Sequence, residues 1–131
     1  MPRPKSEHPT QAELEVLQIL WDRGPLTVRK VWEVLNQRRR RHYTTAASLL
    51  NTMTEKGLLT CEPEGRAFLY RPNVAREKTL GEMVQDLVDR AFEGSASALV
   101  LHALDQCDPS PEEMDEIARI LRQYRKQKGN K

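Results

Sequence analysis

The segment Tyr43–Gly57 constrains the fold most, because its apolar residues recur at helical spacings within a polar stretch. These residues lie at Ala46, Leu49, Leu50 and Met53. Their period predicts a helix of about three and a half turns with one buried face. We expect Thr44 to cap its start and Gly57 to end it in the left-handed conformation. Other elements must then pack on its apolar face.

The opposite face of this predicted helix carries short hydrogen-bonding side chains rather than the Lys and Glu typical of a solvated face. These side chains are Thr44, Thr45, Ser48, Asn51, Thr52 and Glu55. Short donors, acceptors and methyl groups match the base edges of a DNA major groove. The run Arg38–Arg41 directly precedes the helix and suits phosphate contacts. We therefore predict the recognition helix of a winged helix-turn-helix.

Two predicted helices precede this segment, and each begins with a threonine cap. Thr10–Glu13 fits a capping box that starts the first helix, and Gly24-Pro25 ends it. Leu26 is expected in a minimal strand, Thr27 caps the second helix, and Asn36 with the arginine run ends it. The expected buried stripes are Leu14, Leu17, Leu20 and Trp21, then Val28, Val31, Trp32 and Leu35. Both tryptophans are expected to be core anchors.

The pattern after the central helix changes from helical to alternating, which predicts a β-hairpin. Its expected strands are Leu58–Cys61 and Arg66–Arg71, joined by a type I turn at Glu62–Gly65. Phe68 and Tyr70 share one face of the second strand, and we expect them to pack rather than to stack on bases. Three helices followed by a hairpin within residues 10–73 is the order of a winged helix.

Residues 74–131 carry helical periods only, and their apolar stripes are too extensive for a small unit to cover alone. Gly94-Ser95 and Asp108-Pro109 divide the region into three helices, and Ser110–Glu113 fits a second capping box. Ala98–Leu104 is apolar nearly all round, so we expect it to be buried on most sides. We infer a homodimer. Its expected contact residues are Leu80, Val84, Leu87, Leu99, Val100, Leu104, Ile117, Leu121 and Tyr124.

The expected fold class is mainly α, a winged helix-turn-helix followed by a three-helix dimerisation region. The expected domains are an arm at residues 1–9, a DNA-binding domain at 10–73, a dimerisation domain at 74–126 and a fraying tail at 127–131. Charge follows this division. Residues 1–73 hold 12 Lys and Arg against 8 Asp and Glu, whereas residues 74–131 hold 9 against 11. A basic first part indicates a polyanionic partner there.

The remaining chemistry excludes several classes of protein. Cys61 and Cys107 are too few for a disulfide framework and suit a reducing cytosol. His8, His42 and His102 are scattered, so we expect no metal and no cofactor. Without a Gly-rich phosphate loop or a nucleophile elbow, the chain is not expected to be an enzyme. Without a long apolar run or a signal peptide, we expect a cytoplasmic protein with no membrane insertion.

Four pieces of the sequence resemble a known family across nearly the whole chain. They are AELEVLQILW at Ala12–Trp21, YTTAASLLNTMTEKGLL at Tyr43–Leu59, EGRAFLYRP at Glu64–Pro72 and SALVLHAL at Ser97–Leu104. The chain resembles the BlaI/MecI/CopY penicillinase-repressor family of bacterial transcriptional repressors. The resemblance implies an N-terminal winged helix, a C-terminal dimerisation domain and binding to a TACA/TGTA-type inverted repeat.

Within that family the helix beginning at the Thr-Thr position enters the major groove. The resemblance therefore implies base contacts from Thr44, Thr45 and Ser48, and a wing contact from Arg66. Tyr43 fits either packing under the helix start or a phosphate contact. The candidate DNA-binding residues are Arg38, Arg39, Arg40, Arg41, Tyr43, Thr44, Thr45, Ser48, Asn51, Thr52 and Arg66.

Three positions depart from the family pattern. Penicillinase repressors are cut at an Asn-Phe bond after a membrane sensor-protease signals, and the matching residues here are His102 and Ala103. The candidate cleavage region is Leu101, His102 and Ala103. The copper-responsive branch binds metal through C-terminal cysteines, and Ser110–Lys131 contains none. A basic residue common on the recognition helix is Thr52 here, and Arg38–Arg41 can supply that charge.

These observations predict a repressor that binds a palindromic operator as a homodimer and is relieved by proteolysis or remodelling of its C-terminal domain. The expected partners are an operator duplex, a second copy of the chain and a membrane sensor-protease. Two alternatives stay open from the sequence. The winged helix can be a protein-interaction module, or the chain can be a regulator that senses a small ligand. His102 on an apolar helix can also tune dimer strength by titration.

Overall fold

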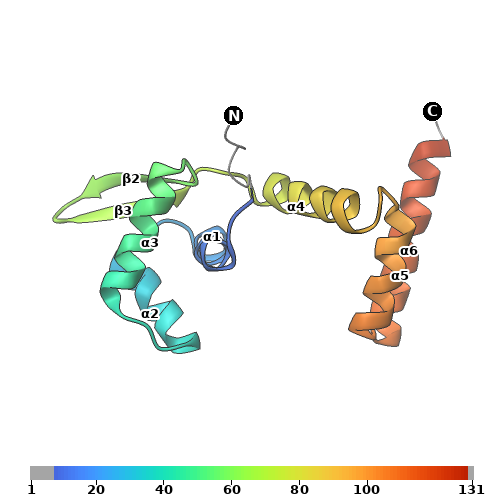
Figure 1. The fold of residues 1–131 in the computed structure, drawn as a ribbon, viewed down its shortest axis with the longest axis horizontal. Helices are drawn as coiled ribbons and strands as arrows, with labels where there is room; N and C mark the ends of the chain where they lie inside the picture. Colours follow the sequence, from blue (N-terminus) through green and yellow to red (C-terminus); the bar gives the residue numbers. More distant parts are fainter. Residues whose placement is uncertain (1–7, 130–131) are drawn as a thin grey trace. The chain divides into compact units, whose positions relative to one another are not determined.

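The computed structural model describes residues 8–129, and the chain forms two compact units, Met1–Val84 and Gln85–Lys131. Most of the predicted arm at residues 1–9 lies outside the described residues. The elements are α1 (Gln11–Arg23), β1 (Leu26–Thr27), α2 (Val28–Arg38), α3 (Tyr43–Glu55), β2 (Leu59–Glu64), β3 (Ala67–Pro72), α4 (Arg76–Ala91), α5 (Ala96–Cys107) and α6 (Pro111–Gly129). Figure 1 shows this order along the ribbon.

The first unit is a winged helix, as predicted. Three helices pack with a three-stranded antiparallel sheet in the order β1-β3-β2, and the hairpin β2–β3 is the wing (Figure 1). The predicted minimal strand at Leu26 is present and pairs with Tyr70. The core draws on α1, α2, α3, β2 and β3, with Leu26 of β1 packed against it, and comprises Val16, Leu17, Ile19, Leu20, Val31, Val34, Leu35, Ala46, Leu50, Met53, Leu59 and Tyr70. Trp21 and Trp32 pack against it, as predicted for core anchors.

The first two helices have the N-caps that the sequence predicts. The Thr10 hydroxyl accepts from the Glu13 amide, and the Glu13 carboxylate accepts from the Thr10 amide, which completes the predicted capping box. The Thr27 hydroxyl accepts from the Lys30 amide at the start of α2. Helix α2 passes through Asn36 and ends at Arg38, so the predicted end is confirmed for the arginine run but not for Asn36. The Asn36 side chain instead accepts a hydrogen bond from the chain that follows the helix.

Helix α3 has the predicted end but not the predicted start. Its N-cap is His42, which makes no side-chain capping hydrogen bond, so the predicted cap at Thr44 is wrong. Gly57 has φ +88° and follows the helix as expected. The Gly57 amide donates to the Thr54 carbonyl and the Leu58 amide donates to the Met53 carbonyl. These two bonds form a Schellman motif, which requires the left-handed residue.

The wing turns later than predicted. Pro63 and Glu64 belong to β2, and the turn falls at Gly65-Arg66 rather than at Glu62–Gly65. Gly65 has φ +63°, and a two-residue hairpin turn favours glycine at such a position. Pro63 is tolerated in β2 because β2 is an edge strand. The strands therefore extend further from the core than the sequence pattern indicates.

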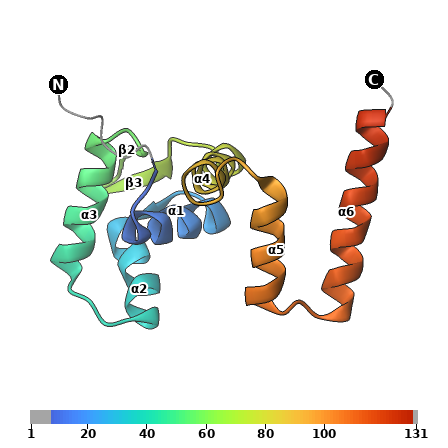
Figure 2. The same ribbon diagram turned by 45° about the vertical axis from the view of Figure 1, so that its right-hand side comes forward.

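The second unit contains the end of α4 together with α5 and α6, which are labelled in Figure 2. Ser95 caps α5, Asp108 ends it with φ +48°, and the Ser110 hydroxyl accepts from the Glu113 amide at the start of α6. Helix α6 continues to Gly129 and so includes residues 127–129 of the predicted tail. The predicted boundary at residues 73–74 precedes α4, whereas the compact units divide within it.

Helix α5 is not buried on most sides in the single chain, contrary to the sequence prediction. None of the described residues of α5 or α6 is buried. One copy of this small unit has too little protein around α5 to cover an apolar helix. The exposed large apolar side chains on α4, α5 and α6 are Val84, Leu87, Val100, Leu101, Met114, Ile120, Leu121 and Tyr124. Leu80, Leu99, Leu104 and Ile117 are half-buried.

Candidate nucleic-acid interface

Helix α3 divides into a buried face and an exposed polar face. Ala46, Leu50 and Met53 are buried in the core, and Leu49 is half-buried. The exposed side chains on this helix include Thr44, Thr45, Ser48, Asn51, Thr52 and Glu55. The structure therefore brings the predicted base-side residues to one accessible helix surface that is free of basic side chains.

The C-terminal end of α3 is held to the start of α1 by an ion pair. Lys56 Nζ lies 2.6 Å from Glu13 Oε2, and the Glu13 side chain is only 4% exposed. Glu13 Oε1 also accepts from the Thr10 amide at 2.9 Å. Burial raises the pKa of the Glu13 carboxyl, but the hydrogen bonds from Lys56 and Thr10 lower it by more, so the net shift is downward. The Glu13 carboxylate thus stays charged and fixes α3 against α1.

The arginine run that precedes α3 separates into two groups. Arg38, Arg39 and Arg40 are exposed, as a phosphate-contacting surface requires. Arg41 is different, because its side chain is 12% exposed and Nη1 lies 3.3 Å from Glu15 Oε1 on α1. The local sequence does not distinguish Arg41 from the other three arginines, because its pairing partner Glu15 lies 26 positions away in the chain.

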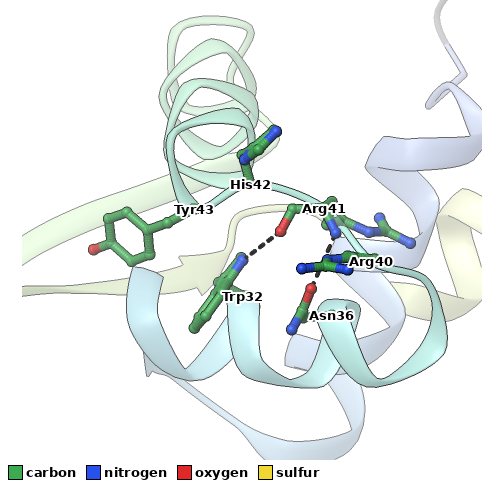
Figure 3. A pocket seen from close by; sticks show the side chains of 6 residues that line it. All are labelled: Trp32, Asn36, Arg40, Arg41, His42 and Tyr43. Atoms are coloured by element: carbon green, nitrogen blue, oxygen red, sulfur yellow. Dashed lines mark hydrogen bonds between the residues drawn. The ribbon is translucent and has the colours of Figure 1, made fainter.

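The backbone of Arg41 is also held in place. Its amide donates to Asn36 Oδ1 at 3.0 Å, and its carbonyl accepts from Trp32 Nε1 at 2.9 Å. Figure 3 shows both bonds, with the indole and the amide side chain of α2 pointing to the same residue. Tyr43 then packs edge-on against Trp32, with ring centroids 5.8 Å apart, and stays exposed at the helix start. These residues, with Arg40 and His42, line an open hollow of about 480 Å³.

The wing presents one cation at its tip and an apolar ring near it. Arg66 is exposed in the two-residue turn. Tyr70 is 9% exposed, but Phe68 on the same strand face is 55% exposed, so the expected packing holds for Tyr70 alone. Arg71 pairs with Glu62 at 3.1 Å across the hairpin. The alternating sequence pattern did not indicate how far the wing extends beyond the core, so the exposure of Phe68 was not predicted.

The other side chains that could bind a metal or react are scattered over the described residues. Within residues 8–129 no group of three or more His, Cys, Asp or Glu side chains could hold a metal ion. The rings of His102 and Phe92 lie side by side, with centroids 5.1 Å apart. Cys61 and Cys107 are free thiols. None of the helices that the structure describes is long and apolar enough to span a bilayer.

The helices, sheet and exposed α3 face define the class of protein as a winged helix-turn-helix protein. The family model described as "Penicillinase repressor" matches residues 9–123, so the chain belongs to the penicillinase repressor family. This match confirms the family resemblance that was drawn from the sequence.

Individual relatives cover most of the chain. It is 27% identical over 119 residues to the "Penicillinase repressor" of Bacillus licheniformis, covering 91% of this chain and 93% of that protein. It is 32% identical over 121 residues to "Transcriptional regulator BlaI" of Mycobacterium tuberculosis, covering 91% of this chain and 86% of that protein. Among solved structures, the DNA binding domain of the repressor BlaI matches with a TM-score of 0.50 and 28% identity, covering 56% of this chain and 90% of that domain.

Proposed function

We propose that this protein is a transcriptional repressor that binds an operator duplex through the exposed face of α3. The observation that carries the proposal is the surface of short polar side chains on α3, flanked by the exposed cations Arg38–Arg40. Such side chains can read base edges, while arginines bind the phosphates on either side. The relatives named as repressors, and a solved repressor fragment named as a DNA binding domain, support this function.

The residues divide by role. Thr44, Thr45, Ser48, Asn51 and Thr52 face the bases, and Arg38, Arg39, Arg40 and Arg66 contact phosphates, with Tyr43 beside them. Phosphate contacts supply most of the affinity and its salt dependence, whereas the α3 face supplies the sequence preference. No step of this function requires a covalent reaction, so the protein acts by binding and not as an enzyme.

The operator is palindromic, because the protein acts as a homodimer formed through α4, α5 and α6. Support comes from the exposed apolar side chains on these helices, which a second copy would cover. Two α3 helices related by a two-fold axis would meet half-sites roughly 34–36 Å apart or at a multiple of that distance. The dimer binds DNA in the cytoplasm and excludes polymerase from the promoter.

Relief of repression follows from weakening the dimer. Leu101, His102 and Ala103 are all exposed on α5, where cutting or remodelling would remove part of the proposed dimer surface. Two linked half-sites gain on the order of 10² or more in effective affinity, and separating the subunits would forfeit that gain. A membrane sensor-protease is the proposed source of the signal.

Fluorescence anisotropy tests the proposal directly. The full chain is titrated into a labelled duplex with a TACA/TGTA inverted repeat and into a scrambled duplex of equal length and composition. We expect tighter binding to the repeat, with affinity that falls as salt rises. Equal or no binding to the two duplexes at about 0.1 M salt, where the Debye length is about 10 Å, would refute sequence-specific recognition.

A further inference from the structure

Arg41 is the one member of the basic run whose side chain turns back into the fold. Its guanidinium reaches Glu15 of α1 at 3.3 Å and the carbonyl of Arg39 at 3.1 Å. Both partners are hydrogen-bond acceptors, so two edges of the guanidinium are already used within the chain. The 12% exposure of the Arg41 side chain leaves little of it for a phosphate.

The backbone of Arg41 is fixed as firmly as its side chain. Asn36 accepts from its amide at 3.0 Å, and Trp32 donates to its carbonyl at 2.9 Å. We call the group Glu15, Trp32, Asn36 and Arg41 the Arg41 clamp. The clamp connects α1, α2 and the segment that leads into α3, so it sets where the chain leaves the core to begin that helix.

Helix α3 lacks the usual local means of fixing its start. His42 is the N-cap residue, and its side chain makes no capping hydrogen bond. A capping side chain normally holds the first turn of a helix in register. Here the residue before the N-cap is held through long-range contacts instead. The direction of the first turn, which carries Thr44 and Thr45, therefore depends on the Arg41 clamp.

We infer that Arg41 is a positioning residue for operator recognition, which it serves through Glu15, and that it is not a phosphate contact. The inference rests on the proposed DNA-binding function and names how the start of the recognition helix is set. It also assigns two roles within the basic run: Arg38–Arg40 contact DNA phosphates, and Arg41 holds the segment that leads into α3. A ligand for Arg41 outside the chain is not needed, because Glu15 already balances its charge.

One substitution changes the affinity for DNA in opposite directions for the two possible roles of Arg41, positioning and phosphate contact. Glu15→Ala removes a carboxylate and places the best helix former in α1. If Arg41 bound phosphate, the change would free its guanidinium and reduce repulsion of DNA, so binding would strengthen. If Arg41 positions α3, the same change weakens operator binding by roughly tenfold, about the cost of one charge-assisted hydrogen bond.

Salt dependence provides the second readout. We expect Arg41→Gln to weaken binding to the inverted repeat while leaving the slope of log K against log salt unchanged. Arg40→Gln, the matched control from the exposed part of the run, is expected to reduce that slope by about 0.9 per subunit. The double variant with Glu15→Ala and Arg41→Gln should bind no more weakly than either single variant, because both remove the same contact.

The experiment uses the full chain and the repeat and scrambled duplexes, with thermal melting of each variant as a check on folding. Glu33→Ala is the carboxylate control, since the Glu33 side chain on α2 is 43% exposed and pairs with Arg29 rather than with the clamp. Loss of preference for the repeat in Glu15→Ala, but not in Glu33→Ala, supports positioning. Should Arg41→Gln fail to fold, the sign seen with Glu15→Ala still decides the question.

Two results would overturn the inference. One is tighter or unchanged repeat binding by folded Glu15→Ala, and the other is a reduced salt slope in Arg41→Gln. Neither result touches the proposed function if the unmodified chain still prefers the repeat and Arg40→Gln still flattens the slope. If the unmodified chain binds neither duplex, the proposed function fails before the role of Arg41 is reached.

Discussion

The buried Glu13–Lys56 pair allows a prediction whose size depends on pH. Lys56 donates to a carboxylate that is 4% exposed, and the second oxygen of that carboxylate is already bonded to the Thr10 amide. Lys56→Ala removes the cation but leaves Glu13 in the same place. The variant therefore keeps a poorly solvated charge with one partner fewer, which is more costly than losing a pair at the surface.

The size of the loss follows from the contact. A hydrogen bond to a charged group contributes about 1.5–3 kcal/mol, and the 36% exposure of Lys56 lets water screen part of it. We expect Lys56→Ala to lower the free energy of unfolding by about 1–2 kcal/mol at pH 7. For a chain of this size that corresponds to a melting temperature lower by roughly 3–8 °C.

The pH dependence has a definite sign. The pKa of Glu13 is lowered in the folded protein from its ordinary value of 4.5, because bonds from Lys56 and Thr10 outweigh the opposing effect of burial. The stabilisation is therefore fully present above pH 4.5 and is lost as pH falls through the folded pKa. We expect the difference between the unmodified chain and Lys56→Ala to shrink in that acidic range.

Thermal denaturation followed by circular dichroism at pH 7 and at acidic pH measures this difference. Lys30→Ala is the control, because Lys30 makes an exposed pair with Glu33 at 4.0 Å. Its effect should stay within about 0.5 kcal/mol at either pH. A pH-independent difference for Lys56→Ala, or one no larger than the control, would show that the pair does not hold α3 as argued.

Three further predictions concern other parts of the chain. Gly57→Ala should destabilise the protein by roughly 1–2 kcal/mol in denaturant unfolding, because an alanine at φ +88° is strained, whereas Gly81→Ala in α4 should be neutral or stabilising. Replacing Arg39 and Arg40 together by Gln should reduce the salt slope for DNA binding by about 1.8 per subunit, and an unchanged slope would exclude both as phosphate contacts. Leu121→Glu should raise the dissociation constant of the proposed dimer by roughly 30-fold or more in analytical ultracentrifugation, and an unaltered dimer would remove α6 from the proposed interface.

Local patterns predicted much of the fold. The period of Ala46, Leu50 and Met53 identified the buried face of α3, and Gly57 identified its end. Both succeed because a helix face and a left-handed end depend on residues within a few positions. The winged-helix order followed from the change of period after Gly57, for the same reason.

Several of the errors concern features that depend on distant residues. The predicted cap at Thr44 was wrong because the helix begins earlier, after a segment held by Trp32 and Asn36. The ion pair of Arg41 with Glu15 joins residues 26 positions apart, and no local pattern marks it. The predicted burial of α5 was wrong for one chain, since burial depends on what packs beside a helix as well as on its composition.

Helix α1 supplies carboxylates to both ends of α3, through Glu13 at the C-terminal end and Glu15 just before the N-terminal end. The scaffold that aims α3 is thus separate from its outward side chains Thr45, Ser48 and Asn51. Under the proposed function, those three positions can change without disturbing the supports, so new operator preferences can evolve, or be engineered, on an unaltered framework.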